Sequence, residues 1–163
     1  MAKRNFNPLL TRYLRERGYL VQNVERWKAK PSTDDPQPQG QKFGGVHVDL
    51  FGFIDFIALI DGQIVGIQST SKKNMRARIK KITNDARENA LAWLSCKGVI
   101  QVWGWEQIVE PGLTQAGKQR KRKHWTPIIY HITKKMLLRD DAEEAAFFAQ
   151  WKNDVSLADD DMS

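Results

Sequence analysis

The sequence has very little cysteine and histidine. Cys96 is its single cysteine, and His47, His124 and His131 show no ligand spacing with it. An internal disulfide is therefore excluded, and a structural zinc site is unsupported. No apolar run approaches the roughly 20 residues that cross a bilayer, and the first residues lack the apolar stretch of a secretory signal. We therefore expect a cytoplasmic protein with no membrane partner.

Acidic residues are scarce over most of the chain. The 26 Lys and Arg residues outnumber the 19 Asp and Glu residues, which gives a net charge of +7. Eight of the acids lie within residues 140–163, so residues 1–139 hold 25 basic and 11 acidic side chains. Such a positive body favours polyanions, and phosphate backbones are the commonest of these. A surface charged only for solubility is the alternative.

The length of 163 residues suits one domain. We assign residues 1–152 to a single domain and residues 153–163 to an acidic disordered tail. Periodicity and chain breakers predict a mixed α/β domain. Helices are predicted at 8–17, 75–94 and 140–151, strands at 19–27, 46–60, 63–70, 99–105 and 128–132, a mobile loop at 30–45 and an irregular basic loop at 106–124.

The dipeptide Asp61-Gly62 predicts a two-residue hairpin turn, which puts Asp55 opposite Gln68. Because side chains alternate along a strand, Asp55, Gln68, Thr70 and Lys72 are expected on one face. Asp55 lies in a nearly continuous apolar stretch, where an unpaired carboxylate is costly. Either a hard cation such as Mg²⁺ or hydrogen bonds from the backbone and Gln68 must compensate it. The residues alone leave both open.

The stretch DLFGFIDFIALIDGQIVGIQSTS, residues 49–71, resembles motifs II and III of the PD-(D/E)XK nucleases. This restriction-endonuclease-like superfamily includes archaeal Holliday-junction resolvases and the VRR-NUC group. The order of elements is similar over residues 8–105, although only the hairpin carries the motif. The resemblance implies a restriction-endonuclease-like α/β core, with a mixed central β-sheet flanked by helices, followed here by a C-terminal helix and the acidic tail.

The same resemblance implies a Mg²⁺- or Mn²⁺-dependent deoxyribonuclease that hydrolyses phosphodiester bonds with low sequence specificity, with branched or processed DNA as a candidate substrate. Asp55 and Gln68 would hold the cation, and Gln68 stands where the family has an acid. Thr70 stands where the family has a lysine, so Lys72 is expected to supply the amine. A solvated lysine at a strand end is the alternative for Lys72.

The missing acid calls for further carboxylates. Glu25 is the preferred third ligand, and a pair with Arg26 is its alternative. Asp49 shares the face of Asp55 but lies six residues, roughly 20 Å, along an extended strand, so it helps only if Gly52 marks a bend. Related enzymes often hold an acid at the place of Glu16, which is expected here as a solvated helix charge.

Basic side chains of the helix at 75–94 and of the basic loop are expected to bind DNA phosphates without reading bases. They are Arg76, Arg78, Lys80, Lys81, Arg87, Lys118, Arg120, Lys121, Arg122 and Lys123, and Trp125 is the candidate for stacking on bases. The main alternative is a catalytically inactive nuclease-fold DNA-binding subunit of a larger complex. A protein-interaction subunit is a further alternative, and a homodimer stays open.

Overall fold

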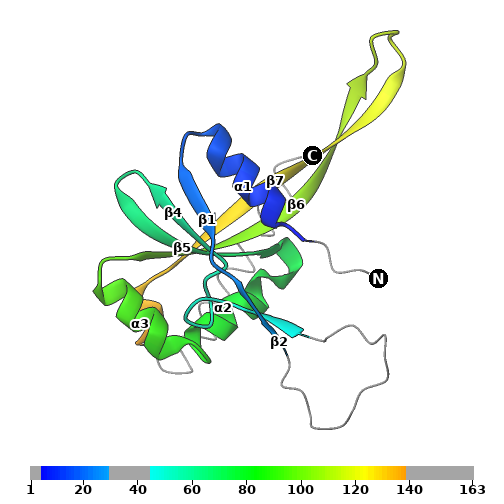
Figure 1. Cartoon of the computed structure of the whole chain (residues 1–163). Helices are drawn as coiled ribbons and strands as arrows, with labels where there is room; N and C mark the ends of the chain where they lie inside the picture. The colour runs from blue at the N-terminus through cyan, green and yellow to red at the C-terminus, as the bar shows by residue number, and fades with distance from the viewer. Residues whose placement is uncertain (1–4, 30–44, 139–163) are drawn as a thin grey trace, which may run out of the picture.

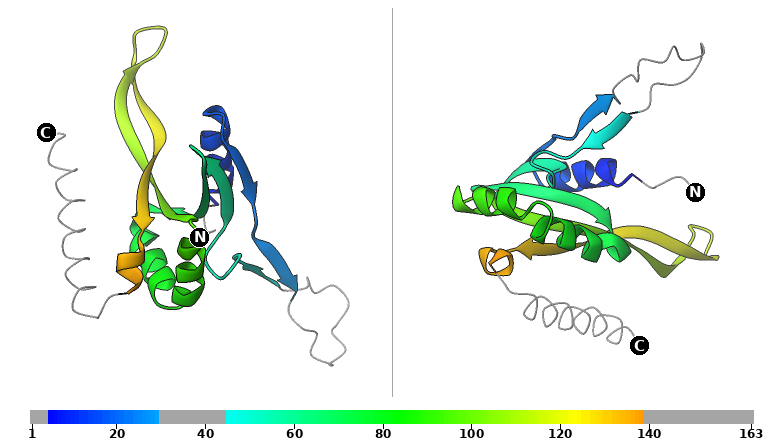
Figure 2. Two further views of the ribbon diagram at one scale, coloured as in Figure 1. Left: turned by 90° about the vertical axis from the view of Figure 1, so that its left-hand side faces the viewer. Right: turned by 90° about the horizontal axis from the view of Figure 1, so that it is seen from below.

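The computed structural model describes residues 5–29 and 45–138. The loop expected at 30–45, except for its last residue, lies outside the described residues, as do the helix expected at 140–151 and the acidic tail. Within the described part, a five-stranded mixed sheet carries helices on both faces, and a two-stranded sheet projects from it (Figures 1 and 2). The predicted α/β class with a mixed central sheet is confirmed at this level.

The elements are short, apart from the last two strands. Their bounds are α1 Asn7–Glu16, β1 Leu20–Asn23, β2 Arg26–Ala29, β3 Gly45–Val48, β4 Phe56–Ile60, β5 Gln63–Ser71, the 3₁₀ turn η1 Lys72–Asn74, α2 Met75–Thr83, α3 Arg87–Ser95, β6 Val99–Leu113, β7 Gln119–Ile132 and α4 Lys134–Leu137. The central sheet has the order β1-β4-β5-β6-β7, in which only β5 and β6 are parallel neighbours. No helix in the described ranges has the length and apolar character that crossing a bilayer requires.

The hairpin of β4 and β5 has the predicted register. Ile60 pairs with Gln63 across the turn. Asp61 and Gly62 have φ values of 49° and 77°, and this left-handed backbone suits a two-residue turn between twisted strands. The turn thereby fixes which residues before β4 lie beside the second half of β5.

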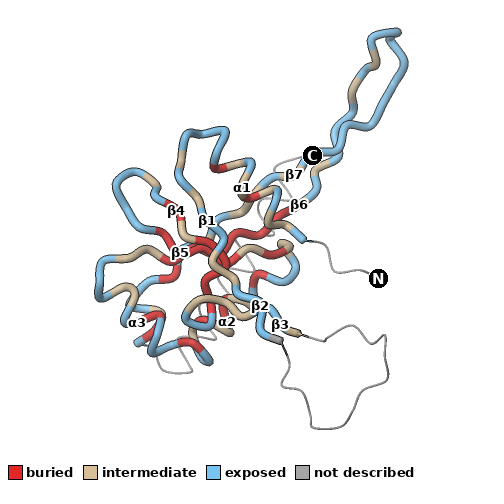
Figure 3. Tube along the Cα trace, viewed as in Figure 1, coloured by how far each residue is buried: buried red, intermediate tan, exposed pale blue. Residues whose placement is uncertain are grey.

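Two hydrophobic clusters hold the sheet from its two faces. α1 packs through Leu10 and Leu14 onto one face, where Trp105 is also buried. The helices α2, α3 and α4 cover the other face, with Ile79 and Ala90 among the fully buried side chains. Figure 3 shows the buried stretches gathered where β4, β5 and β6 meet. Polar side chains at this place are therefore held by a packed core.

The predictions of continuous strands at 19–27 and 46–60 are wrong, because each stretch is interrupted. The strand predicted at 19–27 is β1 and β2, and β2 leaves the central sheet to pair with β3. The strand predicted at 46–60 is interrupted at Phe51 and Gly52, whose φ values are 54° and 82°. A bridge between Leu50 and Ile54 closes this turn. The chain therefore reverses locally just before β4.

The helix predicted at 75–94 is two helices, α2 and α3. The break falls in a run of residues with low helix propensity, Thr83, Asn84 and Asp85. The Thr83 hydroxyl donates to the Ile79 carbonyl at 3.0 Å, a bond that competes with the helical backbone. The bend lets both helices keep contact with one face of the sheet.

The prediction of an irregular loop at 106–124 is wrong. β6 and β7 pair continuously from Ile100 with Ile132 to Leu113 with Gln119. Their outer part, residues 106–126, forms a two-stranded ribbon that extends well beyond the sheet (Figure 1). Water surrounds most of the ribbon, so its sequence lacks the apolar alternation by which a half-buried strand is recognised.

Candidate metal site

Buried polar side chains gather where β4 begins and β5 ends. Asp55 is 4% exposed, Gln68 2% and Thr70 6%. Gln68 Nε2 donates to Asp55 Oδ2 at 2.5 Å, and the Ser69 backbone N–H donates to the same oxygen at 3.0 Å. The predicted proximity of Asp55 and Gln68 is confirmed. These are also the hydrogen bonds that the alternative to a cation required, and they satisfy one carboxylate oxygen.

Two buried acceptor oxygens in the same place are left without a donor. Asp55 Oδ1 and Gln68 Oε1 have no hydrogen-bond partner among the described residues. A buried polar atom without a partner costs about 1–3 kcal/mol. The Asp55–Gln68 pair therefore does not complete this site, and an added electropositive group, either a proton on Asp55 or a cation, would fit it.

Two further carboxylates converge on Asp55. One carboxylate oxygen from each of Glu25, Asp49 and Asp55 lies within 4.8 Å of the other two, and we call these residues the acid cluster. The bend at Gly52, on which the contribution of Asp49 depended, is present and returns the chain toward Asp55. Glu25 joins the cluster where the chain passes from β1 to β2. Glu16 lies exposed at the end of α1 and does not belong to the cluster.

The acid cluster has an unusual charge balance. Burial raises the pKa of Asp55 from its ordinary value of 3.8 to about 8, whereas the Ser69 N–H opposes this rise. The charges of Asp49 and Glu25 and a hydrogen bond with the Asp49 side chain add to it. Without a cation, Asp55 is therefore mostly protonated at neutral pH. A divalent cation would stabilise the charged forms of all three acids together. This oxygen donor set suits Mg²⁺ or Mn²⁺.

Lysines on either side of the site have acidic partners. Lys81 Nζ of α2 lies 2.6 Å from Asp49 Oδ2. Lys72, which was expected on the face of Thr70, lies in η1 just beyond β5, and its Nζ is 2.8 Å from Glu106 Oε1. The contact of Lys81 was not predicted, because the packing of α2 on the sheet creates it and no sequence spacing signals it.

Asn7 is a second residue that the sequence did not indicate. It begins α1, and its Nδ2 donates to Glu25 Oε2 at 2.9 Å. Pro8 in the first turn has the backbone angle that starts a helix. The start of α1 is therefore tied to the acid cluster and orients Glu25.

The side chains predicted to bind DNA lie in two places. Arg76, Arg78, Lys80 and Lys81 are on α2 and Arg87 begins α3, whereas Arg120, Lys121, Arg122 and Lys123 are on β7 and Lys118 lies in the turn before it. All of them are exposed except Arg78 and Lys81, which are half-buried. Trp125 packs edge-on against Phe6, with ring centroids 5.4 Å apart, at the margin of the α1-side core. The ring that is expected to stack on bases therefore already packs against another aromatic ring.

No protein-family model, curated protein or solved structure matches this chain. The geometry of the acid cluster and the distribution of charge are therefore what a functional assignment rests on.

Proposed function

We propose that this chain is a nuclease that hydrolyses DNA phosphodiester bonds with Mg²⁺ or Mn²⁺ held by the acid cluster. The observation that carries the proposal is the convergence of three carboxylates beside a buried Gln68 oxygen that lacks a donor. The order of elements also supports it. α1, the antiparallel strands β1, β4 and β5, the helices α2 and α3, and the parallel strand β6 follow the order expected for a restriction-endonuclease-like core.

In this proposal, the chain's own residues hold and orient the acids. Gln68 and Ser69 fix Asp55 through its Oδ2, and Asn7 fixes Glu25. A cation bound there would lower the pKa of a bound water and offset charge that develops on the phosphate. Asp55 would release its proton to solvent if a cation bound there, so cation binding and proton release would be linked.

In this proposal, Lys81 has the role that the motif III lysine has in the PD-(D/E)XK nucleases. Thr70 offers a hydroxyl but no charge. Lys81 Nζ already lies beside an oxygen of the acid cluster, at 2.6 Å from Asp49 Oδ2. An ammonium group in this place can bind a phosphate oxygen of the substrate next to the acids. Lys72 is held by Glu106 and is the less suitable candidate.

The exposed Lys and Arg side chains of α2 and of the ribbon bind DNA in this proposal. Contacts of Lys and Arg to phosphates are independent of sequence, so low sequence specificity is expected. The ribbon and the β2–β3 sheet project from the body and diverge (Figure 1). A two-stranded ribbon is narrow enough to enter the major groove of duplex DNA. We therefore favour DNA with duplex arms, which includes branched DNA, as the substrate.

A catalytically inactive DNA-binding subunit is the second candidate. Two observations favour it: Gln68 uses its amide nitrogen to bond Asp55, and Thr70 is uncharged. Such a protein would keep the basic surface and the fold without cutting DNA. Metal binding and DNA affinity alone would not separate the two candidates.

The test is nicking of supercoiled plasmid by the purified full chain with Mn²⁺ or Mg²⁺. Asp55→Asn should abolish nicking and leave DNA affinity unchanged or raised, because asparagine brings no negative charge next to the phosphate. Asp85→Asn is the matched control, since Asp85 is exposed and lies outside the acid cluster. Equal nicking by both variants would refute the proposed active site. Salt-dependent DNA binding without nicking by the unmodified chain would favour the second candidate.

A further inference from the structure

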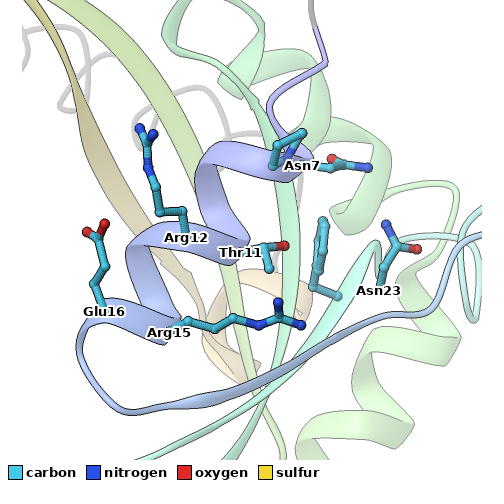
Figure 4. Close-up of a pocket in the computed structure, with 8 residues that line it drawn as sticks. Asn7, Thr11, Arg12, Arg15, Glu16 and Asn23 are labelled. Carbon is cyan, nitrogen blue, oxygen red and sulfur yellow. The ribbon is translucent and has the colours of Figure 1, made fainter.

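A hollow of about 550 Å³ lies beside α1, next to the acid cluster but separate from it. Its walls come from α1, from the end of β1 and from the start of β4, where the Phe56 ring forms an apolar side. Polar groups of Asn7, Thr11, Arg15 and Asn23 complete it (Figure 4). The metal site does not use Thr11, Arg15 or Asn23.

Arg15 gives the hollow its charge. Its guanidinium group extends toward Asn23, whereas Arg12 and Glu16 point away from that group (Figure 4). Within residues 5–29 and 45–138, the Arg15 side chain has no ion-pair or hydrogen-bond partner. An arginine without an acidic partner, directed across a polar hollow, can bind an anion through two parallel N–H bonds.

The other groups in the hollow add hydrogen-bond donors. Asn23 accepts the Glu25 backbone N–H through its Oδ1 at 3.0 Å, which leaves its Nδ2 available to donate. The Thr11 hydroxyl can donate as well. Since Glu16 points away, no carboxylate of the lining opposes an anion there. A tetrahedral phosphate matches this set of one cation and two donors.

The hollow is coupled to the acid cluster through Glu25. Asn7 lines the hollow and donates to the Glu25 side chain, and Asn23 lines the hollow and holds the Glu25 backbone. A phosphate in the hollow would therefore lie one side chain away from the acids. On a DNA strand whose scissile phosphate lies at the acids, a neighbouring phosphate of the same strand would occupy this place.

We propose that the hollow beside α1 is a phosphate-binding subsite that takes a DNA phosphate flanking the scissile bond, with Arg15 as its cation and Asn23 as a donor. The position relative to a scissile bond rests on the proposed nuclease function. Phosphate binding itself does not, and it can be measured without metal and without cleavage.

The first experiment is an NMR titration of the full chain in EDTA, with inorganic phosphate and with a short DNA oligonucleotide in separate arms. The Arg15 Nε–H and Asn23 Nδ2 signals should shift with the oligonucleotide. Arg15→Gln should remove the Asn23 shift. Lys134→Gln, which removes one positive charge on α4 at the opposite face of the sheet, should preserve both shifts. Absence of these shifts with the oligonucleotide, even where inorganic phosphate produces them, or an Asn23 shift that persists in Arg15→Gln, would overturn the proposal.

The second experiment measures DNA affinity against salt concentration in EDTA. Arg15→Gln should reduce the slope of log affinity against log salt by about 0.9 for duplex DNA, because one phosphate contact is lost. Arg15→Lys should retain the slope, and Lys134→Gln should resemble the unmodified chain. A normal slope for Arg15→Gln in a chain that nicks DNA would refute the subsite alone. A reduced slope in a chain that never nicks DNA would support the subsite and refute the nuclease.

Discussion

Asparagine in place of Asp55 should stabilise the metal-free protein in weakly alkaline solution. Asp55 has a pKa near 8 in the folded chain and an ordinary value of 3.8. The folded state therefore binds more protons than the unfolded state between these values, and the free energy of unfolding falls as pH rises through that window. An asparagine does not titrate. Its oxygen can accept the bonds from Gln68 and Ser69 while its amide donates toward the other acids.

The size of the effect follows from the width of the window. One pKa unit corresponds to about 1.4 kcal/mol. From pH 5 to pH 8 the free energy of unfolding of the unmodified chain should therefore fall by up to about 4 kcal/mol through the titration of Asp55, and that of Asp55→Asn should not. Above pH 8 the difference levels off, because Asp55 is then ionised in both the folded and the unfolded state.

The assay is urea unfolding in EDTA at several pH values between 5 and 8, with Asp85→Asn as the control. Asp55→Asn should gain stability relative to the unmodified chain as pH rises, and Asp85→Asn should not. Mg²⁺ or Mn²⁺ should narrow the gap at pH 8 by stabilising only the chain that keeps Asp55. A gap that is constant from pH 5 to pH 8 would refute the reasoning about burial and charge at Asp55.

Four other changes test separate parts of the structure. Glu25→Gln should weaken Mn²⁺ binding at least tenfold by calorimetry, because it removes one charged ligand; unchanged affinity would exclude Glu25 from the site. Lys81→Met should bind Mn²⁺ more tightly but nick DNA more slowly, since it frees Asp49 and removes a phosphate contact; equal nicking would reject the role of Lys81. Gly104→Ala should destabilise the fold by about 1–3 kcal/mol in thermal unfolding, because its methyl group would collide with Met75; an unchanged midpoint would contradict this packing. Arg122→Gln on the ribbon should reduce the salt slope of DNA binding by about 0.9, and an unchanged slope would remove this arginine from the DNA contacts.

The hairpin was predictable from sequence because its two-residue turn permits only one register. That register brought Asp55 to Gln68, and helix α1 followed from Pro8 and the apolar stripe that ends before Gly18. These features depend on neighbours within about 20 residues, where periodicity and turn chemistry decide the structure.

Other features depended on contacts that local patterns do not contain. The return of Asp49 toward Asp55 required two consecutive residues with positive φ, of which only Gly52 signals a bend. The contact of Lys81 with Asp49 spans 32 residues and comes from helix packing. The strands of the ribbon were not predicted, because exposed strands need no apolar alternation. The contacts of Asp49 and Lys81 thus depend on tertiary packing, whereas the hairpin and α1 depend on residues that are close in sequence.

The two-stranded sheet β2–β3 carries both acids that accompany Asp55. Glu25 immediately precedes β2, and Asp49 immediately follows β3. A rotation of this small sheet relative to the central one would have to break the bonds of Glu25 to Asn7 and of Asp49 to Lys81, and it would draw both carboxylates away from Asp55 in the core. Retention of a cation at the proposed metal site would therefore depend on how this small sheet docks against the rest of the molecule.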